Sequence, residues 1–569
     1  MPEIQPDFND VEHIKSRSNY LRGTIAESLA DRATGAVADD DTQLTKFHGF
    51  YQQDDRDLRA ERKQQKLEPH YQFMVRLRLP GGVLTGSQWL ALDEIARTYA
   101  NGTLRVTTRQ TFQYHGVFKE HLKPLLQAVD AAGLDAKGGC GDVNRNVVAN
   151  TNPHRSRLHT QVHDWTHRIS EHLLWRSKAY EELWLDGESS GEPDHEPLYG
   201  SQYLPRKFKV AIAIPPENDS DVYANDLGFI AIADGDELLG FNVSVGGGMG
   251  ATYGEPTTYP RLGSVIGFCK PDQVLAVAEH VIGIQRDYGD RVNRKRARFK
   301  YTLDDNGLEW FKSELTNRLG FSLEPARDAM FTGNGDRFGW TQGDDGRWHL
   351  TLLIENGRIA DVEHQQLMTG LRELAGVHRG EFRLTCNQNL IVANVDEADR
   401  PAVQAIVDQY SLDGGGRQSA LRQASMACVS FPTCGLAMAE SERYLPTFIG
   451  KLDAVMADAG LDDKAIVIRM TGCPNGCARP YLGEIAFTGK APGKYNLYLG
   501  ASFTGDRLNK LYRENIGEDD IMAELVPRIH RYAAEREPGE HFGDFVVRVG
   551  IIHPTREGRL FHEDVGDAA

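Results

Sequence analysis

Alternating apolar and polar residues indicate two similar strand–helix–strand units that lie far apart in the chain. A period of two residues is typical of half-buried strands, and apolar residues at helical spacing follow each alternating run. The alternating apolar residues are Phe73, Val75, Leu77 and Leu79 in the first unit and Leu350, Leu352 and Ile354 in the second. The helical apolar residues are Leu90, Ile95 and Ala96 in the first unit and Leu367, Leu371 and Leu374 in the second.

A short repeat closes both units. The segment Arg105-Val-Thr107-Thr-Arg109-Gln110 returns as Arg383-Leu-Thr385-Cys-Asn387-Gln388. Repeats of this kind mark duplicated structural units. We expect an α+β fold with two half-domains related by pseudo-twofold symmetry and a long insertion between them. Asn387 stands where the first copy has Arg109, so the two halves cannot bind an anion equally well.

The remaining patterns divide the chain into regions. We expect a polar, partner-binding arm without much core of its own, with ordered structure from about Tyr71. The regions are an arm over 1–70, half-domains over 71–137 and 338–412, and α/β lobes over 138–337 and 413–569. The expected helices of the lobes are 164–184, 271–288 and 435–459, and the strands are 207–214, 229–233, 238–245, 465–470, 484–500 and 545–552.

Composition narrows the class of protein. The 569 residues carry 64 Lys and Arg against 81 Asp and Glu, a net charge of −17, which argues against nonspecific nucleic-acid binding as the main function. No apolar run is long enough to span a bilayer, and Met1 to Asp10 lacks the features of a secretory signal. The cytoplasm is therefore the expected location.

Four of the seven cysteines form two close pairs in the last third of the chain. Cys428 and Cys434 are separated by five residues, and Cys473-Pro-Asn475-Gly-Cys477 follows later. Four thiolates supplied by two loops are typical of a 4Fe-4S cluster. A structural zinc site is the alternative, although zinc ligand pairs are usually spaced more closely than the first pair, and buried inert thiols are another. Cys140, Cys269 and Cys386 are expected to be ordinary core or surface thiols.

Basic residues that could form an anion site occur in spite of the acidic total. Lys207 and Lys209 lie two residues apart in an apolar strand, so both ammonium groups point to one face. Arg76 lies on the polar face of another strand, and Arg145 lies in Asn144-Arg-Asn146. Taken one at a time, each of these could equally belong to a solvated strand face.

The cysteine spacing resembles the signature of the siroheme-dependent sulfite and nitrite reductases, which also have duplicated half-domains with Arg/Thr strand ends. The resemblance covers nearly the whole chain and is closest to members that receive electrons from NADPH. The motifs that carry this closer likeness are Ser18-Asn-Tyr-Leu-Arg-Gly-Thr-Ile-Ala26, Tyr51-Gln-Gln-Asp-Asp-Arg56, Arg78-Leu-Pro-Gly-Gly82, Asn144-Arg-Asn146, Leu204-Pro-Arg-Lys-Phe-Lys209 and Gly543-Asp-Phe-Val-Val-Arg-Val-Gly550.

The resemblance implies two prosthetic groups, siroheme and a 4Fe-4S cluster. Cys428, Cys434, Cys473 and Cys477 would hold the cluster, and the Cys477 sulfur would also bind the siroheme iron. It further implies that sulfite is bound and protonated by Arg76, Arg145, Lys207 and Lys209. The residues that would contact siroheme or line its pocket are Arg105, Thr107, Arg109, Gln113, His115, Arg206 and Asn475. His115 on its own would more often be a hydrogen-bonded core histidine.

The implied activity is the six-electron reduction of sulfite to sulfide, with electrons from a flavoprotein (FAD/FMN) partner in a hetero-oligomer. The glycine-rich stretches around Gly246 and Gly333 do not have the context of a dinucleotide site, so the reducing equivalents must come from outside. Nitrite reduction to ammonia is the alternative within the family, and Lys209 argues against it by resemblance. A cluster-only electron carrier or a zinc module would not need the basic residues. The basic run 291–300 is expected to be a solvated patch or a docking surface.

Overall fold

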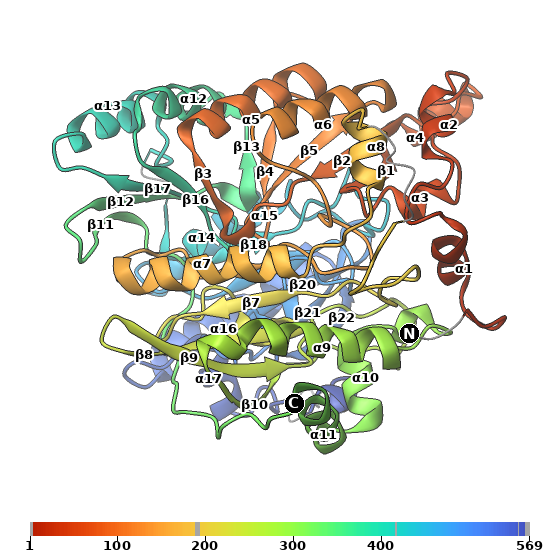
Figure 1. Ribbon diagram of the computed structural model, residues 1–569. Helices are drawn as coiled ribbons and strands as arrows, with labels where there is room; N and C mark the ends of the chain where they lie inside the picture. The colour runs from red at the N-terminus through yellow and green to blue at the C-terminus, as the bar shows by residue number, and fades with distance from the viewer. Residues whose placement is uncertain (1–3, 188–193, 416–417, 556, 564–569) are drawn as a thin grey trace.

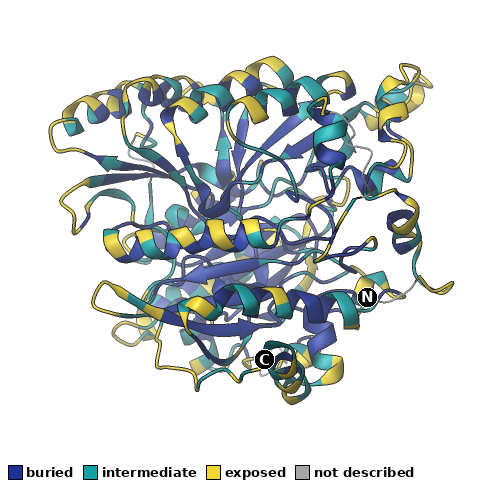
Figure 2. Ribbon diagram, in the orientation of Figure 1, coloured by how far each residue is buried: buried dark blue, intermediate teal, exposed yellow. Residues whose placement is uncertain are grey.

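The computed structural model describes residues 4–187, 194–415, 418–555 and 557–563. Four five-stranded sheets, each accompanied by helices, build the molecule. In Figure 1 two of the sheets lie beneath the helices at the top, and the other two form the lower part of the molecule. Figure 2 shows that the sheets are buried, while the outer faces of the surrounding helices are exposed. Among the described residues, no helix combines the length and the apolar character needed to cross a membrane.

The two upper sheets have equivalent strand arrangements. The first has the order β1-β2-β5-β4-β13 and the second has the order β11-β12-β17-β16-β3. The strands of the first sheet are β1 Phe50–Asp54, β2 Tyr71–Arg76, β4 Leu104–Val106, β5 Phe112–Val117 and β13 Arg358–Ile359. Those of the second sheet are β3 Val83–Thr85, β11 Gly339–Gln342, β12 Trp348–Leu352, β16 Glu381–Leu384 and β17 Leu390–Val395.

The two half-domains exchange an edge strand, which locks them together. β3 belongs to the first unit in sequence, between β2 and α5, but pairs with β16 of the second, and β13 of the second unit pairs with β4 of the first. Helices α5 (Gly86–Tyr99) and α6 (Leu122–Ala131) belong to the first unit, and α12 (Leu367–Val377) and α13 (Arg400–Tyr410) to the second. The reciprocal exchange confirms the predicted α+β fold with pseudo-twofold half-domains.

The lower sheets also share one order and one set of strand directions. In each, two parallel pairings are followed by two antiparallel ones. The first contains β6 Val148–Ala149, β7 Val210–Ala213, β8 Leu227–Asp234, β9 Glu237–Val245 and β10 Ser264–Cys269. The second contains β18 Ser425–Ala427, β19 Ile468–Thr471, β20 Ile485–Ala491, β21 Lys494–Leu499 and β22 Lys510–Ile516. The duplication therefore extends from the half-domains to the lobes.

Helices cover the lower sheets. Those of the first lobe are α7 Ser156–His172, α8 Ala179–Trp184, α9 Val274–Tyr288, α10 Phe299–Asn306 and α11 Leu308–Leu319. Those of the second lobe are α14 Ala420–Gln423, α15 Leu445–Asp458, α16 Glu518–Glu535 and α17 Phe542–Arg548. The predicted single helix over 164–184 is wrong, because the chain leaves the helix after His172 and buries Trp175 before α8 begins.

Two predictions in the second lobe are also wrong. The segment 545–552 was expected to be a strand, but α17 covers its first half and buries Phe542, Phe545 and Val546 at helical spacing. The helix predicted over 435–459 begins only at Leu445. Cys434 therefore lies in a loop, which leaves its backbone free to curve around a ligand.

The first 70 residues are not a separate arm. They form α1 (Asp10–Arg17), α2 (Ile25–Ala30), α3 (Asp41–Leu44), α4 (Arg59–Gln64) and β1. Phe47 and Phe50 are almost fully buried in the same core as the half-domains, and β1 is the edge strand beside β2. The expected start of ordered structure near Tyr71 is therefore wrong. Sequence polarity was misleading because few apolar anchors suffice when a segment packs on an existing core.

The basic run 291–300 is not a solvated patch. Arg291 contacts Glu12 and the Tyr203 carbonyl, and Arg294 contacts Asp142 at 2.8 Å. Lys300 is buried and donates to the Gly248 and Gly250 carbonyls at 3.0 and 2.7 Å. These cations tie α1 and the glycine-rich loop to the first lobe, so the run stabilises the fold instead of offering a docking surface.

Candidate active site

Five of the predicted site residues, Arg109, Lys207, Lys209, Asn475 and Cys477, meet where the two lobes and the first half-domain come together. A cavity there is lined by Lys207 and Lys209 from the first lobe, Thr108 and Arg109 from the first half-domain, and Asn475 to Cys477 from the second lobe. Thr108 Oγ1 donates to the Cys477 carbonyl at 3.1 Å. Three segments that are distant in sequence therefore surround one exposed thiol, since Cys477 is exposed while Cys473 is buried.

The local backbone explains how the two cysteine loops approach each other. β18 and β19 run parallel, so the loops after Ala427 and Thr471 leave the same edge of the sheet. Cys428 N donates to the Met470 carbonyl at 3.1 Å, and Gly472 N donates to Cys428 Sγ at 3.3 Å. An amide directed at a sulfur stabilises a thiolate, as cluster sites require.

The four thiols lie close enough to influence one another. Burial, and then the neighbouring Cys477 charge, raise the pKa of Cys428 to about 12. Burial and Cys477 raise the pKa values of Cys434 and Cys473 in the same way. Four mutually repelling thiolates are unstable without a cation, and a cluster of ferric and ferrous ions supplies that charge. The donor set therefore fits a 4Fe-4S cluster.

A site for a single metal ion requires several ligands close to one point. Within the described ranges, no three His, Cys, Asp or Glu side chains lie close enough together to hold one ion. The sulfurs around a cubane each bind a separate iron, so they stand farther apart than the ligands of one ion.

Three cationic side chains of the first lobe lack the counter-charges that buried cations usually have. In the part of the chain that the structure describes, Arg206, Lys207 and Lys209 have no side-chain hydrogen bond or ion pair. β7 begins only at Val210, so the two lysines lie just before the strand predicted to contain them, but both line the cavity while Phe208 between them is fully buried, as the alternation predicted. Unpaired cations around a cavity are costly unless an anion fills it.

Burial and like charges lower the lysine pKa values. The pKa of Lys207 falls to about 7, first through desolvation and then through Arg298, Arg206 and Arg145. The pKa of Lys209 is also well below its usual value, through desolvation and Lys207. An ammonium group with a pKa near neutrality can release a proton readily to a bound substrate.

Arg76 and Arg145 are held in place by backbone carbonyls instead of carboxylates. Both donate to the Gly139 carbonyl, at 3.3 and 3.1 Å, and Arg76 Nη1 also contacts Cys140 Sγ at 3.1 Å. The Gln113 amide oxygen, when turned toward Arg76, accepts from its Nε at 3.1 Å. Because neutral acceptors leave the positive charge uncompensated, both arginines can still attract an anion.

Other predicted cofactor contacts have varied roles in the fold. Arg109 donates to the carbonyls of Asn146 and Val210, at 3.0 and 2.8 Å, and Thr107 Oγ1 accepts from Arg109 N at 3.2 Å. His115 is 1% exposed, and neither ring nitrogen has a partner among the described residues. A buried imidazole left unpaired is rare in a finished core, which fits a missing polar group at this face of the sheet.

Arg105 differs from the other arginines because a carboxylate already neutralises it. Its Nε pairs with Glu442 at 2.6 Å, and Arg358 pairs with the same carboxylate at 2.7 Å. Arg105 also donates to the Ala427 carbonyl next to Cys428 at 3.0 Å. It therefore joins the first half-domain to the cysteine lobe. The sequence offered no signal for Glu442, which lies among other charged residues.

Sequence reasoning also missed Arg298 and Arg479. Arg298 lines the same cavity as Lys207 and pairs with Asp226 at 2.9 Å. Arg479 lies two residues after Cys477, contacts Asp221, and donates to the Cys386 carbonyl at 3.0 Å. The basic run and the position just after the cysteine motif were the signals that could have indicated them.

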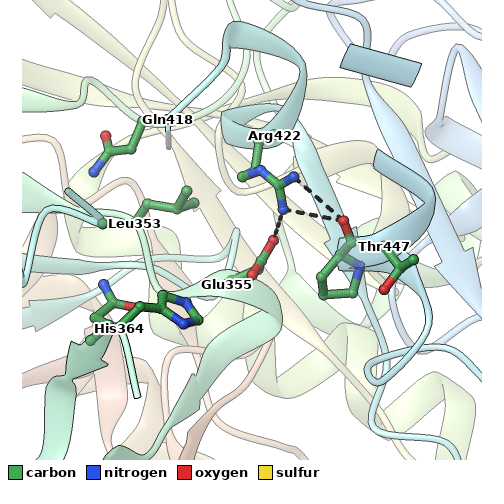
Figure 3. Close-up of a pocket in the computed structure, with 9 residues that line it drawn as sticks. Leu353, Glu355, His364, Gln418, Arg422 and Thr447 are labelled. Atoms are coloured by element: carbon green, nitrogen blue, oxygen red, sulfur yellow. Dashed lines mark hydrogen bonds and ion pairs between the residues drawn. The ribbon is translucent and has the colours of Figure 1, made fainter. Parts of the chain in front are cut away.

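A separate cavity of about 260 Å³ lies between the second half-domain and the cysteine lobe. Figure 3 shows Arg422 at its wall, bonded to Glu355 and to the carbonyl of the proline before Thr447. His364 and Gln418 also line it, but none of the predicted site residues does. This cavity is therefore distinct from the cation-lined site.

Comparison with known proteins agrees with this arrangement. The family model "Nitrite/Sulfite reductase ferredoxin-like half domain" matches residues 64–132 and 340–410. The model "Nitrite and sulphite reductase 4Fe-4S domain" matches residues 164–323, a stretch of the first lobe that lies before all four cysteines of the quartet.

Similar proteins align along almost the full length. "Sulfite reductase [NADPH] hemoprotein beta-component" of Chromohalobacter salexigens is 61% identical over 567 residues, with 98% of each chain covered. The protein of the same name from Bacillus subtilis is 58% identical over 558 residues, again with 98% of each covered. The structure of the Mycobacterium tuberculosis NirA protein superposes with a TM-score of 0.76 at 23% identity, over 95% of this chain and 96% of that one, which supports the fold.

Proposed function

Because the chain belongs to the siroheme-dependent nitrite and sulfite reductase family, we propose that it is the catalytic subunit of an NADPH-dependent sulfite reductase. The reaction is the six-electron reduction of sulfite to sulfide with release of water. The observation that carries the proposal is the pair of lysines without a counter-charge, Lys207 and Lys209, that line the same cavity as Cys477.

The chain's own residues suggest how substrate and prosthetic groups are held. A siroheme coupled to a 4Fe-4S cluster supplies single electrons at an iron that can take a small anion. Cys428, Cys434, Cys473 and Cys477 would hold the cluster, and Cys477, the exposed cysteine, would also hold the siroheme. Of the residues that would hold the cofactor carboxylates, Arg109 and Asn475 line the cavity. The family resemblance supports the same role for Thr107, Gln113, His115 and Arg206.

Four cationic side chains bind sulfite and supply its protons. Arg76 and Arg145 are fixed through the Gly139 carbonyl and bind the oxygens of the anion. Lys207 and Lys209 release protons to those oxygens as water forms, which their lowered pKa values favour. Solvent must then return the protons to the lysines between steps.

The electron donor is proposed to be a flavoprotein (FAD/FMN) subunit that oxidises NADPH in a hetero-oligomer. The support is the word NADPH and the term beta-component in the names of the similar proteins. Reconstitution tests it: the chain mixed with a flavoprotein reductase and NADPH should form sulfide, whereas the chain alone should need a chemical reductant. No NADPH oxidation in the mixture, with full activity on the chemical reductant, would refute this donor.

Steady-state turnover with sulfite and nitrite tests the substrate. We expect the larger kcat/KM with sulfite because its double charge matches the many cations of the cavity. A much larger kcat/KM with nitrite would reassign the enzyme to nitrite reduction.

A further inference from the structure

The motif Tyr51 to Arg56 has no role in the proposed reaction, yet its last residue reaches the cluster site. β1 carries this segment along the edge of the first half-domain, and the chain then turns toward the cysteine lobe. Arg56 N donates to the Pro432 carbonyl at 3.1 Å. The N-terminal region therefore lies against the loop that separates Cys428 from Cys434.

The Arg56 side chain holds the same loop at two further points. Its Nη1 donates to the Cys434 carbonyl at 3.1 Å and to the Ala437 carbonyl at 2.5 Å. Its guanidinium carbon lies 4.5 Å from the centre of the Phe431 ring. A planar guanidinium with several fixed contacts is well positioned, so its charge occupies a defined place beside the loop.

The far end of this loop is exposed to solvent. Leu436 lies between the two carbonyls that Arg56 binds, and it is 69% exposed. Cys434 itself is only partly buried. Solvent exposure alters the reduction potential of a cluster, so the contacts that hold this partly exposed loop in place matter.

The positive charge of Arg56 should also affect the cluster. Because Arg56 Nη1 donates to the Cys434 carbonyl at 3.1 Å, its positive charge lies next to a proposed cluster ligand. A cluster becomes more negative by one charge when it takes up an electron. A fixed cation beside one of its ligands therefore stabilises the reduced form more than the oxidised form.

We propose that Arg56 is a positioning residue that fixes the Cys434 loop and raises the reduction potential of the cluster. This inference rests on the assignment of the cluster to the four cysteines. It also gives the N-terminal region, expected from the sequence to contact the donor, a direct connection to the point where electrons enter. The contact would let the cluster accept electrons more readily.

The test compares three variants of the full-length protein with both prosthetic groups bound. Arg56→Gln removes the charge, Arg56→Lys keeps it, and Arg62→Gln removes a charge from the same region. Arg62 is a suitable control because it donates to the Glu68 carbonyl at 2.7 Å, within its own segment. Iron content and the electron paramagnetic resonance signal of the reduced cluster are measured at a series of fixed solution potentials.

At a potential that half-reduces the wild-type cluster, Arg56→Gln should lower the ratio of reduced to oxidised cluster about tenfold, or ~59 mV for one electron. Arg56→Lys and Arg62→Gln should stay within about threefold of wild type, on the same scale of charge effects. Loss of iron in Arg56→Gln alone would support the positioning role. Full iron content with an unchanged ratio in Arg56→Gln would overturn the proposal.

A further variant separates this inference from the site assignment. Cys434→Ser should lose or alter the cluster signal if Cys434 is a ligand. If Cys434→Ser loses the signal while Arg56→Gln behaves like Arg62→Gln, the cluster site stands and only the role of Arg56 fails. An unaltered signal in Cys434→Ser would contradict the cluster assignment on which both proposals depend.

Discussion

The two lobes have the same strand order but opposite chemistry. The pairs Val210 with Leu227 and Ile468 with Ile485 occupy equivalent places in β7–β8 and β19–β20. Counting back from these pairs, Lys207 and Lys209 of the first lobe correspond to Ala465 and Val467 of the second. Counting forward, Cys473 and Cys477 correspond to Pro215 and Asp219. One lobe thus supplies cations and the other supplies thiols.

The half-domains differ in the same manner. The turns are alike, because Thr107 and Thr385 each accept from the backbone amide two residues later at 3.2 Å. Arg109 points its charge toward carbonyls at the cation-lined cavity, whereas Asn387 donates to the buried carboxylate of Asp336 at 3.2 Å. A duplicated backbone therefore fixes positions, and a few side chains decide which copy can bind an anion.

The strongest way to break the difference between the lobes is to give the first lobe the residues of the second. The double variant Lys207→Ala and Lys209→Val should reduce kcat/KM for sulfite by about 10³-fold, because two charges that bind and protonate the anion are lost. Steady-state turnover with a chemical reductant measures this effect, with siroheme and iron content as controls. A loss of less than tenfold in a fully loaded variant would show that these lysines are not the acid groups.

A second comparison concerns the equivalent residues Arg105 and Arg383. Arg105 is 4% exposed and pairs with Glu442 of the other lobe, while Arg383 pairs with Glu381 of its own strand at 2.9 Å. Glu442→Gln leaves two partly buried arginines without a counter-charge and should destabilise the protein by about 3 kcal/mol. Glu381→Gln, the matched control, should cost about 1 kcal/mol or less. Denaturation curves that rank the two variants equally would contradict this assignment.

The buried lysines should also affect the pH dependence of stability in the protein without its prosthetic groups. Folding lowers the Lys207 pKa from 10.5 to about 7, in surroundings that include Arg298, Arg206, Arg145 and Cys477. Between these pKa values the unfolded chain binds more protons, so this lysine makes stability rise with pH from about 7 upward.

Lys207→Met removes that contribution. It should stabilise the cofactor-free protein by about 1–3 kcal/mol at pH 7 and flatten the rise in Tm above pH 7. Thermal unfolding across the pH range measures both. A variant that is less stable than wild type at pH 7 would show that Lys207 is not an uncompensated charge.

The smallest effect is expected in the second half-domain. Asn387→Arg restores the residue type of Arg109, but Ala465 and Val467 still replace the lysines on that side. The siroheme content per chain and kcat/KM for sulfite should therefore change by less than about twofold, as for a charge outside the reacting site. If the variant bound a second siroheme per chain, the difference between Arg109 and Asn387 alone would explain why only one half-domain binds the cofactor.

The sequence indicated the duplication and the cysteine loops because both depend on local pattern. Alternation, the Arg/Thr repeat and the cysteine spacing are visible without tertiary contacts. The exchange of β3 and β13 could not be predicted, since strand partners are chosen by packing and not by local propensity. The same limit explains α17, where valines that favour strands form a helix against the core.

Charged segments were the hardest part of the sequence to interpret. Glu12, Asp142 and Arg291 look like surface residues in the sequence, but each is buried in ion pairs that join α1 to the first lobe. Pairing across segments hides such charges from any composition argument. The same reason kept Arg298 and Glu442 from being recognised, whereas Lys207 and Lys209 were found because their alternation with buried Phe208 is local.

Cys477→Ser tests the central claim, that one sulfur of the second lobe links the cluster to the catalytic centre among the cations of the first. Absorption spectra, electron paramagnetic resonance and sulfite turnover should be recorded on the same purified sample. The variant should lose the link between the two groups and should form no sulfide. A serine variant that keeps both groups bound, coupled and active would contradict it.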